Sequence, residues 1–141
     1  MSELSSCGRI NMKIENQVVS LKLAKELKEA GWKQSGIFSW AIDTDNKWGV
    51  FFDIPEDGDE WYKEDDGIIV APTATELGEE LPSTLFVQDT GHLLRILKTN
   101  DIGWVVMFES ITGYKMKSYI EHKLADALAR MWLYIKREAL I

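Results

Sequence analysis

The sequence is poor in the residues that cross-link chains, bind metals or break helices. Its 141 residues include one cysteine, two histidines and three prolines. The single cysteine, Cys7, has no partner for an internal disulfide, and a chain of this length can bury enough apolar surface to fold without one. No run approaches the roughly 18 consecutive apolar residues of a membrane span, and the start has no apolar stretch of the secretory type. We therefore expect a reduced, cytoplasmic protein without a membrane segment.

The chain also lacks the signatures of common active sites. The phosphate-binding pattern G-x-x-x-x-G-K-[ST], the dinucleotide pattern G-x-G-x-x-G and the nucleophile motif G-x-S-x-G are all missing. His92 and His122 lack the spacing and the companion cysteines of a zinc site. His92 is expected at the solvated end of a strand, and His122 in a surface pair with Asp126 on the last helix. We predict no catalytic residue, no metal site and no cofactor; whether the protein is an enzyme stays open, with the balance against it.

Acidic residues outnumber basic ones, and the excess is confined to one segment. The sequence has 23 Asp and Glu against 16 Lys and Arg, a formal net charge of −7. Residues 53–66 hold eight acids and one lysine, which is the same net charge, so the rest of the chain is balanced. The excess of acidic residues repels phosphates, and the lysines of the first predicted helix alternate with glutamates. We therefore expect no nucleic-acid binding.

The acidic segment 53–66 is expected to form a loop that contains two aromatic residues. Trp61 and Tyr62 are the predicted binding residues, because aromatic side chains are unusual in a segment that only solvates the chain. They either fold back on their own domain or present an anchor to a basic partner. The spacing partly matches an EF-hand calcium loop, but Pro55 stands where an oxygen ligand is needed. A further alternative is that the acids compete with DNA for a basic host protein.

Hydrophobic periodicity predicts helices mixed with antiparallel strands. Helical spacing marks residues 20–30, with Ser20 as the N-cap and Gly31 as the C-terminal stop. A capping box at Thr73 and Glu76 begins a short helix, which Pro82 ends. Alternation with a period of two and turn residues between the runs mark the strands. These strands are expected at 36–42, 48–52, 68–71, 85–88, 92–99 and 104–109.

The C-terminal segment is predicted to form one long helix. A second capping box is proposed at 118–121, and no glycine or proline interrupts the chain from there to residue 141. A helix of some 20 residues spans roughly 30 Å, enough to cross a domain. Its run 131–135 is apolar on all sides, so that end is expected to be buried by the domain or by a second subunit, in a homodimer through the C-terminal helix.

Together these elements predict an α+β fold. Runs of antiparallel strands with few helices favour a mainly antiparallel sheet of about five to six strands. An N-terminal helix, a short middle helix and a long C-terminal helix are expected to pack on it. Residues 1–17 show no clear period and are expected to form a flexible arm or a weak strand. Residues 18–141 are expected to form a single domain with the acidic loop at 53–66.

Three stretches taken together resemble known proteins. They are residues 19–40, residues 71–82 with the motif APTATELGEELP, and residues 124–135 with the motif LADALARMWLYI. As a set they resemble a group of small uncharacterised proteins encoded by tailed bacteriophages and prophages. The resemblance implies a phage or prophage origin and expression in the cytoplasm of a host cell. We expect a host or phage protein as the partner. It transfers no activity and no site residue.

The sequence therefore favours a phage or prophage accessory protein that acts by protein binding or self-association, without catalysis. The aromatic strands, the apolar helix end and the missing catalytic patterns all support this hypothesis. The alternative is a small-ligand-binding or enzymatic domain with a pocket between sheet and helices.

Overall fold

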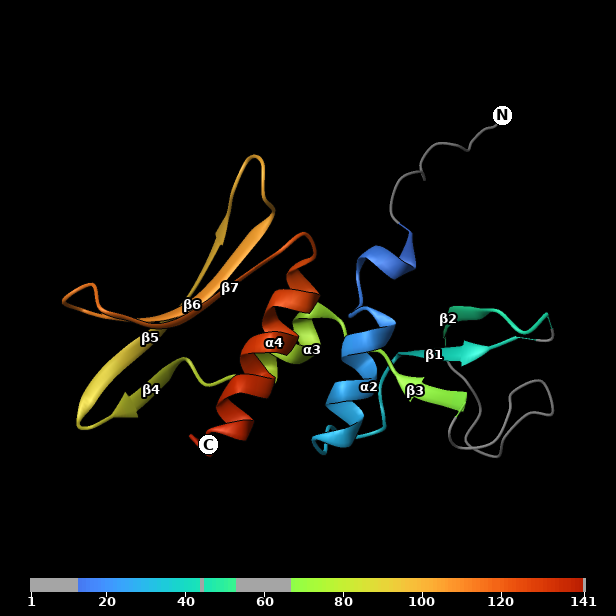
Figure 1. Ribbon diagram of the computed structural model, residues 1–141, viewed down its shortest axis with the longest axis horizontal. Coiled ribbons are helices and arrows are strands. Elements are labelled where there is room, and N and C mark those ends of the chain that lie inside the picture. The colour runs from blue at the N-terminus through green and yellow to red at the C-terminus, as the bar shows by residue number, and fades with distance from the viewer. Residues whose placement is uncertain (1–12, 44, 53–66, 141) are drawn as a thin grey trace.

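The computed structural model describes residues 13–43, 45–52 and 67–140, which form an α+β fold with three α-helices and two antiparallel sheets (Figure 1). In Figure 1 the helices lie between the two sheets. The described elements, in chain order, are η2 (Ile14–Asn16), α2 (Leu21–Glu29), β1 (Phe38–Ile42), β2 (Trp48–Phe52), β3 (Ile68–Val70), α3 (Ala74–Glu80), β4 (Thr84–Val87), β5 (Thr90–Lys98), β6 (Trp104–Ser110), β7 (Lys115–Glu121) and α4 (Leu124–Arg137).

The first sheet has three strands in the order β2-β1-β3. β1 and β2 form the predicted hairpin, in which Trp40 lies opposite Val50 and the turn residue Asn46 has a φ of 63°. β3 pairs with the other edge of β1. The indole N–H of Trp40 donates to the carbonyl of Val19 at 2.9 Å. That hydrogen bond ties the central strand of this sheet to the segment that leads into α2.

The second sheet has four strands in the order β4-β5-β6-β7, and all of its pairs are antiparallel. The capping box predicted at 118–121 is wrong, because these residues lie in β7, with Ser118 opposite Met107 and Ile120 opposite Val105. The local pattern Ser-x-x-Glu fits a helix start, but pairing with β6 supplies a ladder of hydrogen bonds that no local pattern shows. The prediction of one sheet of five to six strands is also wrong, since the described residues form seven strands in two sheets.

The first two helix starts are confirmed. Ser20 caps α2 by accepting the amide of Leu23 at 3.5 Å, and Gly31 follows the helix with a φ of 99°. The capping box of α3 is complete, because the Thr73 hydroxyl accepts the Glu76 amide at 3.1 Å and the Glu76 carboxylate accepts the Thr73 amide at 2.9 Å. These bonds satisfy amides that the first turn of a helix leaves unpaired.

α4 lies at the centre of the hydrophobic core. It contacts α2 and α3 as well as β6 and β7 of the second sheet. The side chains of Met131, Leu133 and Ile135 are buried, and the indole of Trp132 meets that of Trp32 edge-on with ring centres 5.0 Å apart. The chain's own elements therefore bury the end of the helix that is apolar on all sides, and its composition requires no second subunit.

A buried carboxylate joins α4 to α2. Asp126 lies on α4, and its Oδ1 accepts the backbone amide of Ser20 at 2.7 Å. The predicted surface pair between Asp126 and His122 is wrong, because Asp126 is directed toward the start of α2 rather than toward solvent. Burial raises the pKa of Asp126, and the hydrogen bond from Ser20 opposes that effect only in part.

We expect Asp126→Ala to lower the free energy of unfolding by about 1–3 kcal/mol, because the Ser20 amide loses its acceptor in a partly buried place. Asp126→Asn keeps an oxygen acceptor and removes the buried charge. At neutral pH it should therefore lower the free energy of unfolding much less than Asp126→Ala does. Urea denaturation of the native chain and both variants measures the two losses. Equal losses for the two variants would contradict the role of the hydrogen bond.

The raised pKa of Asp126 also predicts a pH dependence. The folded chain holds the proton of this carboxyl more readily than the unfolded chain does. The free energy of unfolding therefore rises as pH falls from above the raised pKa to the ordinary value for Asp, and this contribution is constant outside that interval. We expect the native chain to gain stability relative to Asp126→Asn over that interval. If the free energy of unfolding changed identically with pH in the two proteins, the raised pKa of Asp126 would be contradicted.

Candidate protein-interaction surface

The residues predicted to bind a partner, Trp61 and Tyr62, lie outside the described residues, as does the acidic loop 53–66 with its partial calcium pattern. Among the residues that the structure describes, no group of three or more His, Cys, Asp or Glu side chains is placed to hold a metal ion. No helix in those same ranges is both long enough and apolar enough to cross a bilayer. Other surfaces of the described chain are therefore considered in turn.

The two histidines occupy different environments. The prediction of a solvated strand end for His92 is wrong, because this residue is buried on the face of the second sheet that packs toward α4. Its Nδ1 lies 3.1 Å from the carbonyl oxygen of Thr90, and its ring meets the ring of Tyr114 edge-on with centres 6.2 Å apart. His122 is exposed in the short link between β7 and α4. They lie on different elements and do not form a common site.

Two clefts lie beside the helices, with volumes of about 400 and 550 Å³. The smaller one lies between α2, β7 and α4, and both arginines that line it are paired with glutamates of the chain. Arg130 pairs with Glu121 and also lies over the ring of Tyr119 at 4.6 Å, while Arg137 pairs with Glu26 at 3.1 Å. These two arginines are therefore already compensated by carboxylates of the chain, and neither is a free cation for an anionic ligand.

The second sheet has an inner face on α4 and an outer face that no described element covers (Figure 1). Val106 and Phe108 of β6 point inward and are fully buried in the core cluster. Because side chains alternate along a strand, their neighbours point outward, and the register sets these neighbours side by side across the sheet. The outer face comprises Thr84 and Phe86 of β4, Leu93, Arg95 and Leu97 of β5, Val105, Met107 and Glu109 of β6, and Ser118 and Ile120 of β7.

The outer face exposes large apolar side chains. The exposed fraction is 74% for Phe86, 50% for Leu93, 43% for Leu97 and 47% for Ile120. An antiparallel sheet with one face in water normally presents polar residues on that face. Contiguous exposed apolar patches are typical of protein-interaction sites, and covering the exposed half of one such side chain contributes about 1 kcal/mol. The outer face therefore has the composition of a binding surface.

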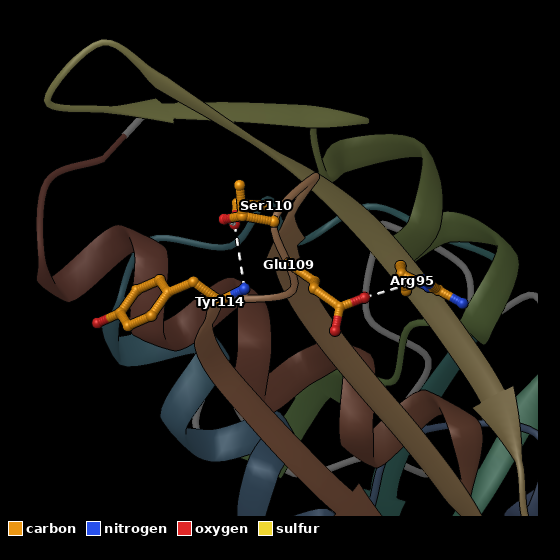
Figure 2. A network of polar contacts seen from close by, with 5 residues as sticks. Arg95, Glu109, Ser110 and Tyr114 are labelled. Atoms are coloured by element: carbon orange, nitrogen blue, oxygen red, sulfur yellow. Dashed lines mark hydrogen bonds and ion pairs between the residues drawn. The ribbon is translucent and has the colours of Figure 1, made fainter.

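An ion pair lies in the middle of the outer face. A guanidinium nitrogen of Arg95 on β5 donates to Oε1 of Glu109 on β6 at 2.9 Å, and Figure 2 shows the two side chains meeting across the neighbouring strands. Met107, directly opposite Arg95, is only 5% exposed although it does not belong to the core cluster. Met107 is thus a buried position on this face, unlike Leu93 and Leu97 of the neighbouring strand. The result is a polar centre with apolar side chains toward both ends of the face.

The turn after β6 lies at one end of the sheet and is held by its own hydrogen bonds. The Ser110 hydroxyl accepts the Tyr114 amide at 3.1 Å and lies 2.9 Å from the Thr112 hydroxyl. In Figure 2 the ring of Tyr114 extends away from the Arg95–Glu109 pair. Ile111 in this turn is 94% exposed. It is thus an exposed apolar residue that does not belong to the outer face, and it serves as a control for experiments on that face.

Comparisons of the chain with protein-family models, with curated proteins and with solved structures found no match. They assign the chain to no family, and the resemblance to phage proteins stays an expectation. The composition and the geometry of the outer face are the guide to function that the described residues provide.

Proposed function

We propose that the protein is a non-enzymatic binding module whose outer face docks onto a protein, either a different protein or a second copy of the chain. The supporting observation is the exposure of four large apolar side chains on one sheet face that no described element covers: Phe86, Leu93, Leu97 and Ile120. Apolar and aromatic residues around an arginine are the composition that the centres of protein interfaces favour. In line with the resemblance, the different protein is a host or phage protein in the host cytoplasm.

The charges of the outer face favour a protein over a nucleic acid as the partner. Arg95 lies 2.9 Å from Glu109, so its charge is compensated within the chain. A phosphate backbone is bound by rows of uncompensated lysines and arginines. An apolar surface with one compensated ion pair instead suits a partner surface that is itself largely apolar.

Photo-crosslinking from the outer face tests this function. A benzophenone amino acid is placed at position 97 or, in a second protein, at position 111, and each protein is expressed in the cells in which the chain is native. Leu97 lies on the outer face, whereas Ile111 is more exposed but lies in the turn beyond it. We expect covalent protein adducts from position 97, including adducts with the chain itself, and few from position 111.

A competing substitution shows whether the adducts depend on the face. Leu93 lies on the outer face together with position 97, so Leu93→Gln should reduce the yield of adducts. Ile111→Gln changes a residue outside that face and should leave the yield unchanged. Because both residues are exposed, neither change should shift the free energy of unfolding by more than about 0.5 kcal/mol. Equal adduct yields from positions 97 and 111, or none from either, would refute the proposed function.

A further inference from the structure

We infer that the outer face packs against the outer face of a second copy of this chain, in a two-fold symmetric sandwich of two four-stranded sheets. This inference rests on the proposed function, because it names the partner of the same surface. A two-fold interface brings the same patch together from both copies, so the patch must be complementary to itself. The charges and the register of the outer face meet that requirement.

The ion pair makes the outer face complementary to itself in charge. A central patch of one sign would repel its own copy, but here Arg95 and Glu109 lie side by side. In this sandwich the two-fold axis lies between the two sheets, runs parallel to the strands and passes midway between β5 and β6. It therefore places β5 of each copy over β6 of the other copy. Arg95 lies opposite Met107 in the sheet register, so it then stands over the partner's Met107, beside the partner's Glu109. Each arginine thereby gains a second carboxylate, and each carboxylate a second arginine.

The same axis stacks apolar side chains on each other. Leu97 lies opposite Val105 in the register, so each Leu97 then stands over the partner's Val105. Sheets stacked in this way lie about 10 Å apart, and their inward side chains interdigitate. Leu97, which is half exposed in the single chain, becomes part of a shared core.

The size of the outer face places the dimer near the lower limit of specific interfaces. Four strands about 4.8 Å apart and the seven residues of β6, at about 3.4 Å each, define a surface of roughly 19 by 24 Å. Side chains that stand up from this surface increase its accessible area. The flat area of about 460 Å² is below the area of about 600–1,000 Å² per partner that is typical of specific interfaces, and the relief of the side chains raises the accessible area toward that range.

Charge reversal and mixing test the inference. Sedimentation velocity of the full chain at micromolar concentration should give twice the mass of one chain of 16.1 kDa. Arg95→Glu and Glu109→Arg each place like charges across the interface, and each should raise the dimer dissociation constant about a hundredfold. An equimolar mixture of the two variants should dimerise again, because one copy then carries two anions where the other carries two cations.

A matched control reverses a charge elsewhere. Lys33 pairs with Glu80 at 3.4 Å, and both side chains are exposed and lie outside the outer face. Lys33→Glu therefore breaks a comparable surface pair and should leave the dimer intact. Leu97→Asp is the second test variant, because it buries a charge in the interface but replaces a side chain that is 43% exposed in the single chain. It should be monomeric, with the far-ultraviolet circular dichroism spectrum of the native chain, and it should melt at a lower temperature because it loses the stabilisation that dimerisation gives.

Three results would overturn the inference: a native chain that is monomeric at these concentrations, a dimer that survives Arg95→Glu and Leu97→Asp, or monomeric single variants that do not dimerise on mixing. The crosslinking experiment separates the two proposals. If the chain is monomeric but position 97 still forms adducts with another protein, the dimer is refuted and the binding function stands. If position 97 forms no adducts at all, both proposals fail.

Discussion

Replacing Trp132 by alanine will lower the free energy of unfolding by about 3–5 kcal/mol, the range typical of a buried aromatic residue truncated to alanine. Trp132 is 6% exposed on α4, and its ring meets that of Trp32 edge-on at 5.0 Å. Trp32 follows α2 in the sequence, so this contact holds the central helix against the N-terminal part of the fold. The truncation removes the contact and leaves a cavity between the two segments.

Two further variants separate ring contact from volume. Trp132→Phe keeps an aromatic ring and should lose clearly less stability than Trp132→Ala in urea denaturation. A double-mutant cycle with Trp32→Ala should give a coupling energy of about 0.5–1.5 kcal/mol, because edge-to-face aromatic pairs are worth that much beyond their burial. A loss below about 1 kcal/mol for Trp132→Ala would show that the helix is not packed as described.

Gly103→Ala will also destabilise the chain strongly, by about 3 kcal/mol or more. Gly103 ends the turn between β5 and β6 with a φ of 118°, which disfavours any residue with a Cβ atom. A Cβ there would lie 2.4 Å from the carbonyl oxygen of Glu121 and 2.8 Å from the Cα of His122. Both are backbone atoms, so no side-chain rotation relieves the clash, and β6 must move away from the end of β7.

Gly113→Ala is the matched control for that substitution. Gly113 has a φ of 89°, but a Cβ on it would meet nothing within 4 Å. Gly113→Ala should therefore lower the free energy of unfolding by only about 1–2 kcal/mol, the cost of placing a residue with a Cβ at a positive φ. The difference between the two glycine variants in urea denaturation measures the contact between the β5–β6 turn and the end of β7. Equal losses would contradict that contact.

Local sequence patterns predicted the elements whose determinants lie close together in the chain. The cap of Ser20 on α2 and the capping box of Thr73 and Glu76 each join residues three apart, and both are present in the structure. The β1–β2 hairpin was predictable for a similar reason, because alternating apolar residues flank a short polar turn.

The pairing of distant segments could not be predicted in this way. Residues 118–121 fit a helix start locally, yet they form part of β7 because β6 lies beside them. The hydrogen bond from Ser20 to Asp126 joins residues 106 apart, and nothing near Asp126 in the sequence indicates it. The division of the strands into two sheets likewise depends on tertiary packing, which overrides local preference.

The outer face was predictable only in part. Residues 93–97 read Leu-Leu-Arg-Ile-Leu, so β5 has apolar side chains on both faces, which a strand with one face in water does not need. This run of apolar residues can be recognised in the sequence without the structure. The gathering of Phe86 and Ile120 on the same face depends on the register of β4 and β7, which the sequence alone does not define.

Crosslinking from position 97, compared with position 111, tests most directly the central claim that the outer face is where this protein binds protein. A reactive group at position 97 should form covalent protein adducts that Leu93→Gln reduces, and the more exposed position 111 should form few. Equal yields from the two positions would mean that the outer face is an ordinary exposed surface, and the claim would be wrong.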